Sequence, residues 1–246
     1  MSETAPLLEL KSLEKRYGSV VVADSVSLSV PRGTCFGVVG PNGAGKTSLF
    51  HMIAGTVRPN GGRIFFEGRD ITDVPAHARV SLGIMRAFQI PQPFPHLTVY
   101  ENALMAACYG GGMRGAAAES WCVEVLSRLD LLAKAEMPAG QLLLLDRKRL
   151  ELAKAVASRA KLLLLDEIAG GLTEPECHEL VAVINGIRAR GVTIVWIEHV
   201  VHALLAVVDR IAVIDFGRKI ADGAPREVLS SPAVAEIYMG PAEEAA

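Results

Sequence analysis

One eight-residue segment near the start of the chain restricts the possible folds more than any other feature. It fits the pattern G-x-x-x-x-G-K-[ST] and follows an apolar run, Cys35–Val39, that reads as a buried strand. Its members are Gly40, Pro41, Asn42, Gly43, Ala44, Gly45, Lys46 and Thr47. The glycines permit a tight turn that points backbone N–H groups inward, and a helix starting near Gly45 adds its positive end. The sequence predicts a phosphate-binding loop between a strand and a helix.

Two side chains of this loop suit a bound polyphosphate. Lys46 can pair with the β- and γ-phosphates, and the Thr47 hydroxyl can coordinate a Mg²⁺ that otherwise keeps water and phosphate oxygens. The alternative is an ordinary glycine-rich turn that carries an exposed lysine.

Size and charge narrow the class of protein. The chain has 246 residues, half of them hydrophobic, which is enough for one large domain or for a domain with an insertion. Its 25 basic and 27 acidic residues give a formal charge of −2, without a basic block. This balance argues against a nucleic-acid partner.

Neither a signal sequence nor a membrane helix is expected. Residues 1–6 lack a basic region followed by an apolar core, and the longest apolar candidate, residues 200–214, is interrupted by Asp209 and Arg210. We therefore expect a chain that stays in the cytoplasm. The four cysteines show no metal-like spacing and read as free thiols in a reducing compartment; they are Cys35, Cys108, Cys122 and Cys177.

Alternating patterns predict antiparallel strands at residues 7–10 and 26–30, and a turn at residues 59–62 leads into a third antiparallel strand at 63–66. Tyr17, between the first two, is either a structural aromatic at a strand end or a platform for a nucleotide base.

A helical region is predicted in the middle of the chain. Residues 83–89 read as a core strand, and three prolines then take the chain out of the sheet. Thr98 and Glu101 match a capping box, and further helical patterns cover about 116–129 and 147–159. Consecutive helices without a strand indicate an α-helical insertion over about residues 92–158.

Two acidic residues end the next apolar run, residues 161–165. Such a run is typical of a parallel strand buried on both faces, whose carboxyl end opens onto a ligand crevice. Asp166 could hold Mg²⁺ through water, and Glu167 could orient or deprotonate an attacking water. The alternative is a pair of helix N-cap residues.

A further core strand, residues 192–197, ends at Glu198 and His199. A metal pair of His199 and His202 would lack supporting ligands, so a γ-phosphate contact by His199 is the better interpretation. Residues 211–214 and 218–221 are predicted as closing strands, with short helices after Pro225 and Pro232.

With Gln89, Asp166, Glu167 and His199 in this order behind the loop, the chain resembles the ATP-binding subunits of ABC transporters over nearly its whole length. Gln89 corresponds to the Q-loop, residues 162–167 to the Walker B strand, residues 169–173 to the D-loop and His199 to the switch histidine. Several segments are similar to the longer ATP-binding subunit of branched-chain amino acid importers; they are residues 70–72, 75–77, 83–89, 149–153 and 237–240.

The resemblance implies an α/β fold with a P-loop NTPase core: a mostly parallel sheet, an antiparallel β subdomain within residues 7–70 and a helical subdomain at 92–158, all in one nucleotide-binding domain of residues 1–246. It implies ATP and Mg²⁺ as cofactors. Tyr17, the loop residues 40–47 and Ser48 would bind the nucleotide. Thr47, Gln89 and Asp166 would serve the metal, and Glu167, His199 and Gln89 would take part in hydrolysis.

The resemblance also implies an assembly. We expect a second ATP-binding subunit in a hetero- or homodimer, two transmembrane permease subunits and a separate periplasmic or extracellular solute-binding protein. The chain would lie peripherally on the cytoplasmic side of a prokaryotic inner membrane.

One segment departs from the family pattern. The signature, normally Leu-Ser-Gly-Gly-Gln-like, falls on residues 142–146, which read Leu-Leu-Leu-Leu-Asp. From sequence, Leu143, Leu144 and Leu145 would face a partner's ATP, and Asp146 would bring like charge near its phosphates. This predicts that the reciprocal site, which this segment forms with the phosphate loop of the partner subunit, is compromised.

Four functions follow from these patterns. The leading one is the ATPase subunit of an importer for branched-chain or other hydrophobic amino acids or related solutes. The alternatives are a lipid or lipopolysaccharide export ATPase, a soluble ABC ATPase acting on ribosomes or DNA, and a weakly catalytic regulatory subunit.

Overall fold

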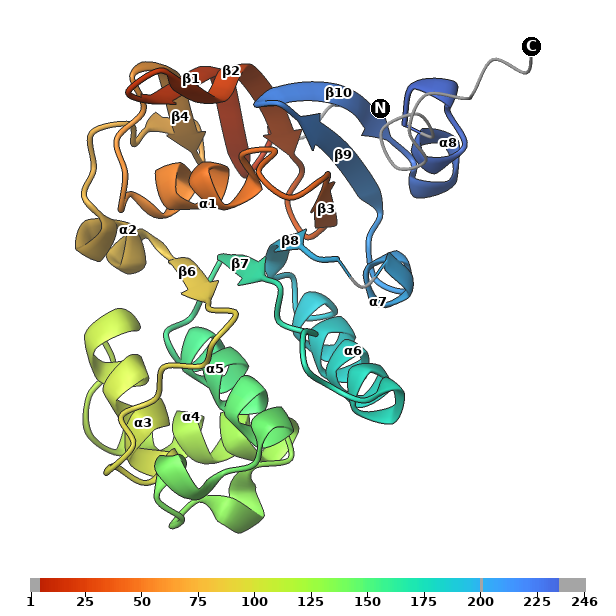
Figure 1. Ribbon diagram of the computed structural model, residues 1–246. Coiled ribbons are helices and arrows are strands. Elements are labelled where there is room, and N and C mark those ends of the chain that lie inside the picture. The colour runs from red at the N-terminus through yellow and green to blue at the C-terminus, as the bar shows by residue number, and fades with distance from the viewer. Residues whose placement is uncertain (1–4, 200, 235–246) are drawn as a thin grey trace.

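The computed structural model describes residues 5–199 and 201–234 and contains two β-sheets (Figure 1). A four-stranded antiparallel sheet has the order β2-β1-β4-β5, and a six-stranded sheet has the order β10-β9-β3-β8-β7-β6. Within the second sheet, the five strands from β9 to β6 are parallel and β10 is antiparallel to β9. The expected α/β class with a mostly parallel sheet is confirmed.

The antiparallel sheet is built from the first seventy residues. Its strands are β1 (Leu8–Tyr17), β2 (Val20–Val30), β4 (Gly61–Phe66) and β5 (Arg69–Asp70). The first two are longer than alternation predicted, because irregular register near Leu10 and Leu13 breaks the two-residue period within each strand.

The six-stranded sheet has an apolar core on each face. Along β7 (Leu162–Asp166), Leu163 and Leu165 pack in one core, while Leu162 and Leu164 pack in the other. A strand covered on both sides needs apolar residues at every position, which explains the continuous leucine run. The other strands of this sheet are β3 (Cys35–Val39), β6 (Ile84–Ala87), β8 (Thr193–Ile197), β9 (Arg210–Asp215) and β10 (Arg218–Gly223).

Three helices gather at the end of the molecule opposite the antiparallel sheet (Figure 1). They are α3 (Val99–Met105), which continues as a π-helical turn (Ala106–Gly110), α4 (Gly115–Arg128) and α5 (Leu144–Ala157). The capping box of Thr98 and Glu101 is present. The prediction that the third of these helices begins near Arg147 is wrong, because α5 begins three residues earlier at Leu144.

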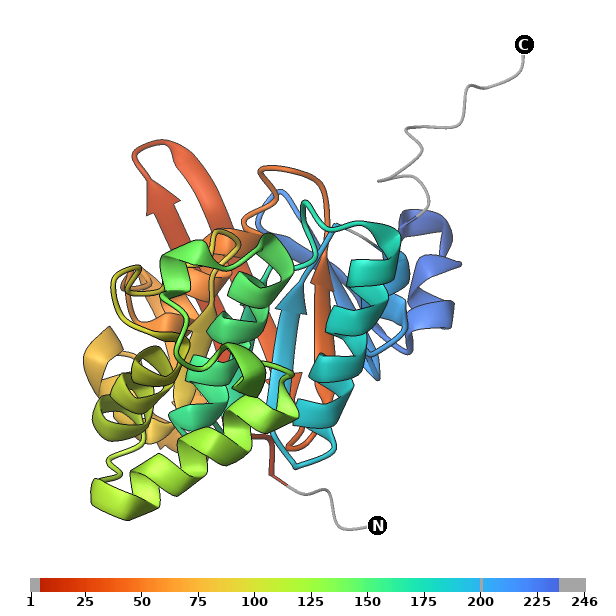
Figure 2. The same cartoon turned by 90° about the horizontal axis from the view of Figure 1, so that it is seen from below.

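The remaining α-helices border the two sheets. They are α1 (Lys46–Ala54), α2 (Ala76–Leu82), α6 (Glu174–Arg188), α7 (Val201–Leu205) and α8 (Pro225–Leu229). Two short 3-10 helices, Leu132–Lys134 and Ala139–Gln141, lie between α4 and α5 in the chain. The view in Figure 2 shows α6 beside the strands of the parallel sheet. The short helix expected after Pro232, and the segment 237–240, lie wholly or largely outside the described residues.

One buried arginine joins the end of α1 to the segment that follows β5. Arg79 on α2 donates to the carbonyl oxygens of Met52 and Ile53 at 2.7 Å, and to that of Ile71 at 2.6 Å. Burial lowers its pKa to about 10. The guanidinium donates to carbonyl groups in the last turn of α1, where the helical hydrogen-bond pattern ends.

Candidate functional site

The phosphate loop has the predicted position between β3 and α1, and crowding explains two of its glycines. Gly40 has φ 151°, and a Cβ there would lie 1.9 Å from the carbonyl oxygen of Ile214. Gly45 has φ 102°, and a Cβ there would lie 2.0 Å from the carbonyl oxygen of Val22. Only glycine fits at these two points, where the loop passes between β2 and β9.

Lys46 lies at the first position of α1 with its side chain folded over the loop. Its ammonium group donates to the carbonyl oxygens of Gly40 at 2.7 Å and Pro41 at 2.8 Å. Burial lowers the pKa of Lys46, while the carboxylates of Glu167 and Asp166 act in the opposite direction. The charge interactions show that the loop lysine faces the acidic strand end, as the order of motifs predicted.

Three predicted catalytic side chains meet at the carboxyl ends of the parallel strands. Gln89 Nε2 donates to Glu167 Oε2 at 2.8 Å, and His199 Nε2 lies 2.6 Å from Glu167 Oε1. Glu167 adopts φ 47°, an uncommon value for a residue with a side chain. Its N–H donates to the carbonyl oxygen of Ile197 at 2.8 Å, which holds this turn against β8. The structure therefore brings Gln89, Glu167 and His199 into one hydrogen-bonded group.

Asp166 has a partner that the sequence analysis missed. Its Oδ2 forms an ion pair with Arg86, and both side chains are largely buried. The Arg86 guanidinium also stacks 5.0 Å from the ring centre of Phe88, and its Nε has no hydrogen-bond partner. The available signal was a lone charged residue inside the predicted core strand 83–89.

Glu198 is a second functional candidate that was overlooked. Its carboxylate is 3% exposed and accepts hydrogen bonds from the backbone N–H of Ala169 at 3.0 Å and from that of His199 at 3.0 Å. The Trp196 indole donates to it at 3.2 Å. This carboxylate joins the turn after β7 to the end of β8, so it holds together the two segments that carry Glu167 and His199.

The region has the donors that Mg²⁺ prefers. Thr47 is exposed in the first turn of α1. One Asp166 oxygen pairs with Arg86, and the Gln89 amide nitrogen donates a hydrogen bond to Glu167. Hydroxyl, carboxylate and amide oxygens suit a cation that usually takes one or two carboxylates and keeps water and phosphate oxygens. No cluster of three or more His, Cys, Asp or Glu with metal-site geometry occurs in residues 5–199 and 201–234.

Tyr17 lies at the end of β1 and is 48% exposed, with the Lys15 ammonium 5.0 Å from its ring centre. Ser48 is half-buried in the first turn of α1. The exposed ring of Tyr17 is accessible to a stacking partner.

The signature-equivalent segment differs from the sequence expectation. Leu143 is 77% exposed and Leu144 is 41% exposed, but Leu145 and Asp146 are buried. Asp146 pairs with Lys134 and, at 3.4 Å, with Arg149. The prediction that Leu145 and Asp146 face outward is wrong, because α5 begins at Leu144 and its first turn directs them inward.

Comparison with known proteins identifies the family. Residues 23–170 match the ABC transporter family. BraF of Pseudomonas aeruginosa, a high-affinity branched-chain amino acid transport ATP-binding protein, is 32% identical, with 96% of this chain and 99% of that protein covered. LptB of Acidithiobacillus ferridurans, a lipopolysaccharide export system ATP-binding protein, is 34% identical, with 95% of this chain and 97% of that protein covered.

Solved structures agree with these sequence matches. The crystal structure of an ATP-binding cassette of an ABC transporter in its ADP conformation superposes with a TM-score of 0.88 at 30% identity, and covers 97% of this chain and all of that chain. No helix within the described part of the chain is long and apolar enough to span a membrane. The chain belongs to the ATP-binding cassettes of the ABC transporter family, ATPases that work with membrane permease subunits to power transport.

Proposed function

We propose that this chain is the ATP-hydrolysing subunit of a multi-chain importer for branched-chain or other hydrophobic amino acids, or for related small solutes. The observation that carries the proposal is the hydrogen-bonded group of Gln89, Glu167 and His199 behind an intact phosphate loop, in a chain similar to BraF over nearly its full length. In this proposal residues 1–246 form one nucleotide-binding domain, with the subdomains 7–70 and 92–158.

The phosphate loop binds the nucleotide in this proposal. Backbone N–H groups of residues 40–47 surround the phosphates, and Lys46 exchanges its bonds with the Gly40 and Pro41 carbonyls for the β- and γ-phosphates. Ser48 adds a hydroxyl in the first helical turn, and the exposed Tyr17 ring stacks on the base.

Asp166, Thr47 and Gln89 would hold Mg²⁺, which would supply charge neutralisation for the phosphates when bound. Arg86 restrains Asp166 through one carboxylate oxygen and leaves the other oxygen for the metal's water shell. These residues position the nucleotide before any bond changes.

Glu167 carries the chemical step. It orients the water that attacks the γ-phosphorus and accepts its proton, while the bond from that phosphorus to the β–γ bridging oxygen breaks. The 2.6 Å contact of His199 with Glu167 and the 2.8 Å contact of Gln89 hold the carboxylate from two sides. His199 also contacts the γ-phosphate as charge develops on it.

The proposed partners are a second ATP-binding subunit, two transmembrane permease subunits and a separate solute-binding protein outside the membrane. The chain then lies on the cytoplasmic side of a prokaryotic inner membrane. Support comes from the segment after Gln89, where Ile90 is 74% exposed and Phe94 is 55% exposed. Apolar side chains exposed next to a catalytic glutamine suit a contact that transmits ATP-driven closure to the permeases.

A lipopolysaccharide exporter is the second candidate, because LptB is similar to this chain over almost the same length. Co-purification of the membrane subunits, followed by reconstitution in vesicles, separates the two. Leucine-loaded binding protein should stimulate ATP hydrolysis and drive labelled leucine inward. Stimulation by lipopolysaccharide alone would favour export, and absence of hydrolysis in every assembly would favour a regulatory subunit.

A further inference from the structure

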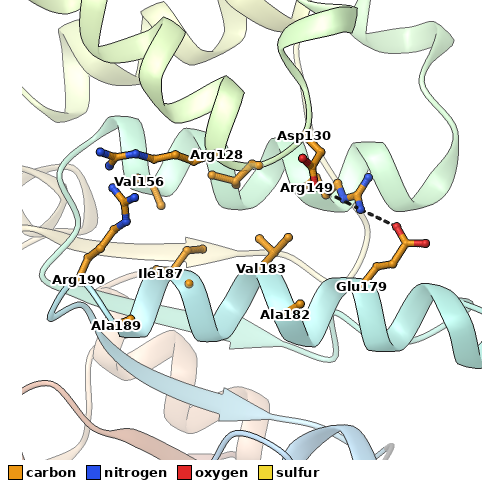
Figure 3. Close-up of a pocket in the computed structure, with 12 residues that line it drawn as sticks. Arg128, Asp130, Arg149, Val156, Glu179, Ala182, Val183, Ile187, Ala189 and Arg190 are labelled. Carbon is orange, nitrogen blue, oxygen red and sulfur yellow. Dashed lines mark hydrogen bonds and ion pairs between the residues drawn. The ribbon is translucent and has the colours of Figure 1, made fainter.

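A cavity that shares no lining residue with the predicted nucleotide site lies between the helical region and α6. Its volume is about 580 Å³, within the usual range for small-molecule pockets. Helix α4 and the turn after it contribute Arg128, Leu129 and Asp130, and α5 contributes Arg149 and Val156 (Figure 3). The opposite wall is formed by α6 and the turn after it; its lining residues are Glu179, Ala182, Val183, Gly186, Ile187, Ala189 and Arg190.

Two guanidinium groups face each other at one end of this cavity. Figure 3 shows Arg128 and Arg190 reaching toward one another from opposite walls. Arg128 forms an ion pair with Glu124 and stacks 5.7 Å from the Trp121 ring centre. Arg190 forms no ion pair with any residue in the described ranges. About one positive charge therefore remains uncompensated at this end, and an anion between the two groups would remove their mutual repulsion.

The other end carries no such excess. Arg149 pairs with Glu179 at 2.6 Å, with Asp146 at 3.4 Å and with Asp130 at 3.9 Å. These three carboxylates outnumber the Arg149 guanidinium, and Lys134 pairs with only one of them, so this end repels a second anionic group. The ammonium group of an amino acid zwitterion would lie beside its own carboxylate, next to Arg128 and Arg190, where positive charge is unfavourable. The charge distribution favours a ligand with a single negative group.

The wall between the two ends is largely apolar. Leu129 and Ile187 are buried, and Val156 and Val183 are half-buried. The space exists because α6 carries a small residue at Gly186, where a Cβ would have no heavy atom within 4 Å. An aliphatic body would remove this apolar surface from water at roughly 25 cal/mol per Å².

We propose that this cavity binds an aliphatic monocarboxylate, with the carboxylate between Arg128 and Arg190 and the hydrocarbon body along α6. A guanidinium matches a carboxylate through two parallel hydrogen bonds. Such a ligand contacts α4, α5 and α6 together and so bridges the helical region and the parallel-sheet region. The proposal is independent of the transported solute.

Calorimetric titration of the full chain with decanoate tests the proposal. Three related compounds test the negative charge, the hydrocarbon body and the absence of an ammonium group separately. Decanoate should bind at one site, whereas decanol lacks the charge and acetate lacks the body, so both should bind at least about tenfold more weakly. Leucine, a zwitterion, should also bind more weakly. Equal binding of acetate or leucine, or no binding of decanoate, would overturn the assignment.

Variants locate the site. Arg190→Gln should weaken decanoate binding about tenfold, whereas Arg159→Gln, an exposed arginine outside the cavity lining, should leave it unchanged. Gly186→Leu places a side chain in the open space and should abolish binding. Gly186→Ala adds one methyl group and should retain it.

The two Gly186 variants also control for folding. Glycine inside a helix is less favourable than alanine, so neither variant should lower the melting temperature of the chain. Loss of decanoate binding in Gly186→Leu at an unchanged melting temperature is the expected result. Unchanged decanoate binding in Gly186→Leu, or equal effects of Arg190→Gln and Arg159→Gln, would show that decanoate binds elsewhere and that the proposal is wrong.

Discussion

The carboxyl edge of the parallel sheet and the N-terminus of α5 have opposite chemistry. At the sheet edge, each acidic group has a polar partner: Glu167 has Gln89 and His199, and Asp166 has Arg86. At the start of α5, Leu143 is 77% exposed and no side chain caps the helix. The comparison indicates that the structure brings the predicted catalytic groups of this chain together, whereas the start of α5 exposes apolar side chains.

The burial of Asp146 refines this contrast. Its carboxylate is neutralised by Lys134 and Arg149, so it does not repel phosphate as the sequence alone suggested. If the site that this surface forms with a partner's phosphate loop is weak, the cause is what Leu143 and Leu144 lack, a hydroxyl group and a close backbone approach, and not added negative charge. The free N–H groups of the first turn still favour an anion.

The largest expected effect comes from Glu167→Gln, which removes the proposed base while keeping the size of the side chain. ATP hydrolysis by the assembled transporter should fall by roughly 10² to 10⁴, with ATP binding retained. Steady-state phosphate release and binding of a labelled nucleotide measure the two quantities. The same change in the partner subunit is the matched comparison. Equal losses of hydrolysis from the two changes would contradict the expectation that the site at this chain's own phosphate loop is the more active of the two.

A loss of stability is expected from Arg86→Met, which leaves the buried Asp166 carboxylate without its cation. The free energy of unfolding should fall by about 3 kcal/mol in urea titrations. Adding Asp166→Asn to this variant should recover part of the loss, because the uncompensated charge is then gone. If the two single changes simply add, the pair does not stabilise the sheet edge.

Lys46→Ala should weaken ATP binding by roughly 10- to 100-fold, because it removes charged hydrogen bonds to the β- and γ-phosphates. Equilibrium binding of a fluorescent ATP analogue measures this change, and Lys46→Arg, which keeps the charge, is the control. The Gly40 carbonyl that Lys46 bonds is buried and loses its charged donor in Lys46→Ala, so the melting temperature of each variant is measured beside its affinity. Unchanged affinity would mean that the loop is not the nucleotide site.

The sequence predicted the sheet edge well because its elements are local. A glycine-rich loop after an apolar strand, and acids directly after buried strands, place side chains by backbone geometry alone. Arg86 and Glu198 were missed because their partners are distant in sequence: Arg86 pairs with Asp166, and Glu198 receives the Ala169 N–H. Only the register of β6, β7 and β8 brings them together.

The start of α5 was mispredicted for a related reason. Leucines fit either a strand or a helix, and no capping residue marks the beginning of this helix. Only the packing of Leu145 and the ion pairs of Asp146 reveal that the first turn lies at residues 144–147.

The smallest expected effect tests the α5 surface directly. Leu143→Ser would restore a hydroxyl at the N-cap position, where serine is favoured, and should stabilise α5 by about 1 kcal/mol. If Leu143 limits the site that this chain forms with a partner's phosphate loop, the same change should raise ATP hydrolysis at that site a few-fold, by roughly the worth of one hydrogen bond. Hydrolysis at this chain's own loop should not change.

The assay uses assemblies in which Glu167→Gln silences the site at this chain's own phosphate loop, so that only the reciprocal site is measured. Leu143→Ala is the control, since it removes the exposed apolar chain without adding a hydroxyl. A gain with serine and none with alanine would assign the deficit to the missing hydroxyl, whereas equal rates for the two would show that the leucine side chain is not what weakens the reciprocal site.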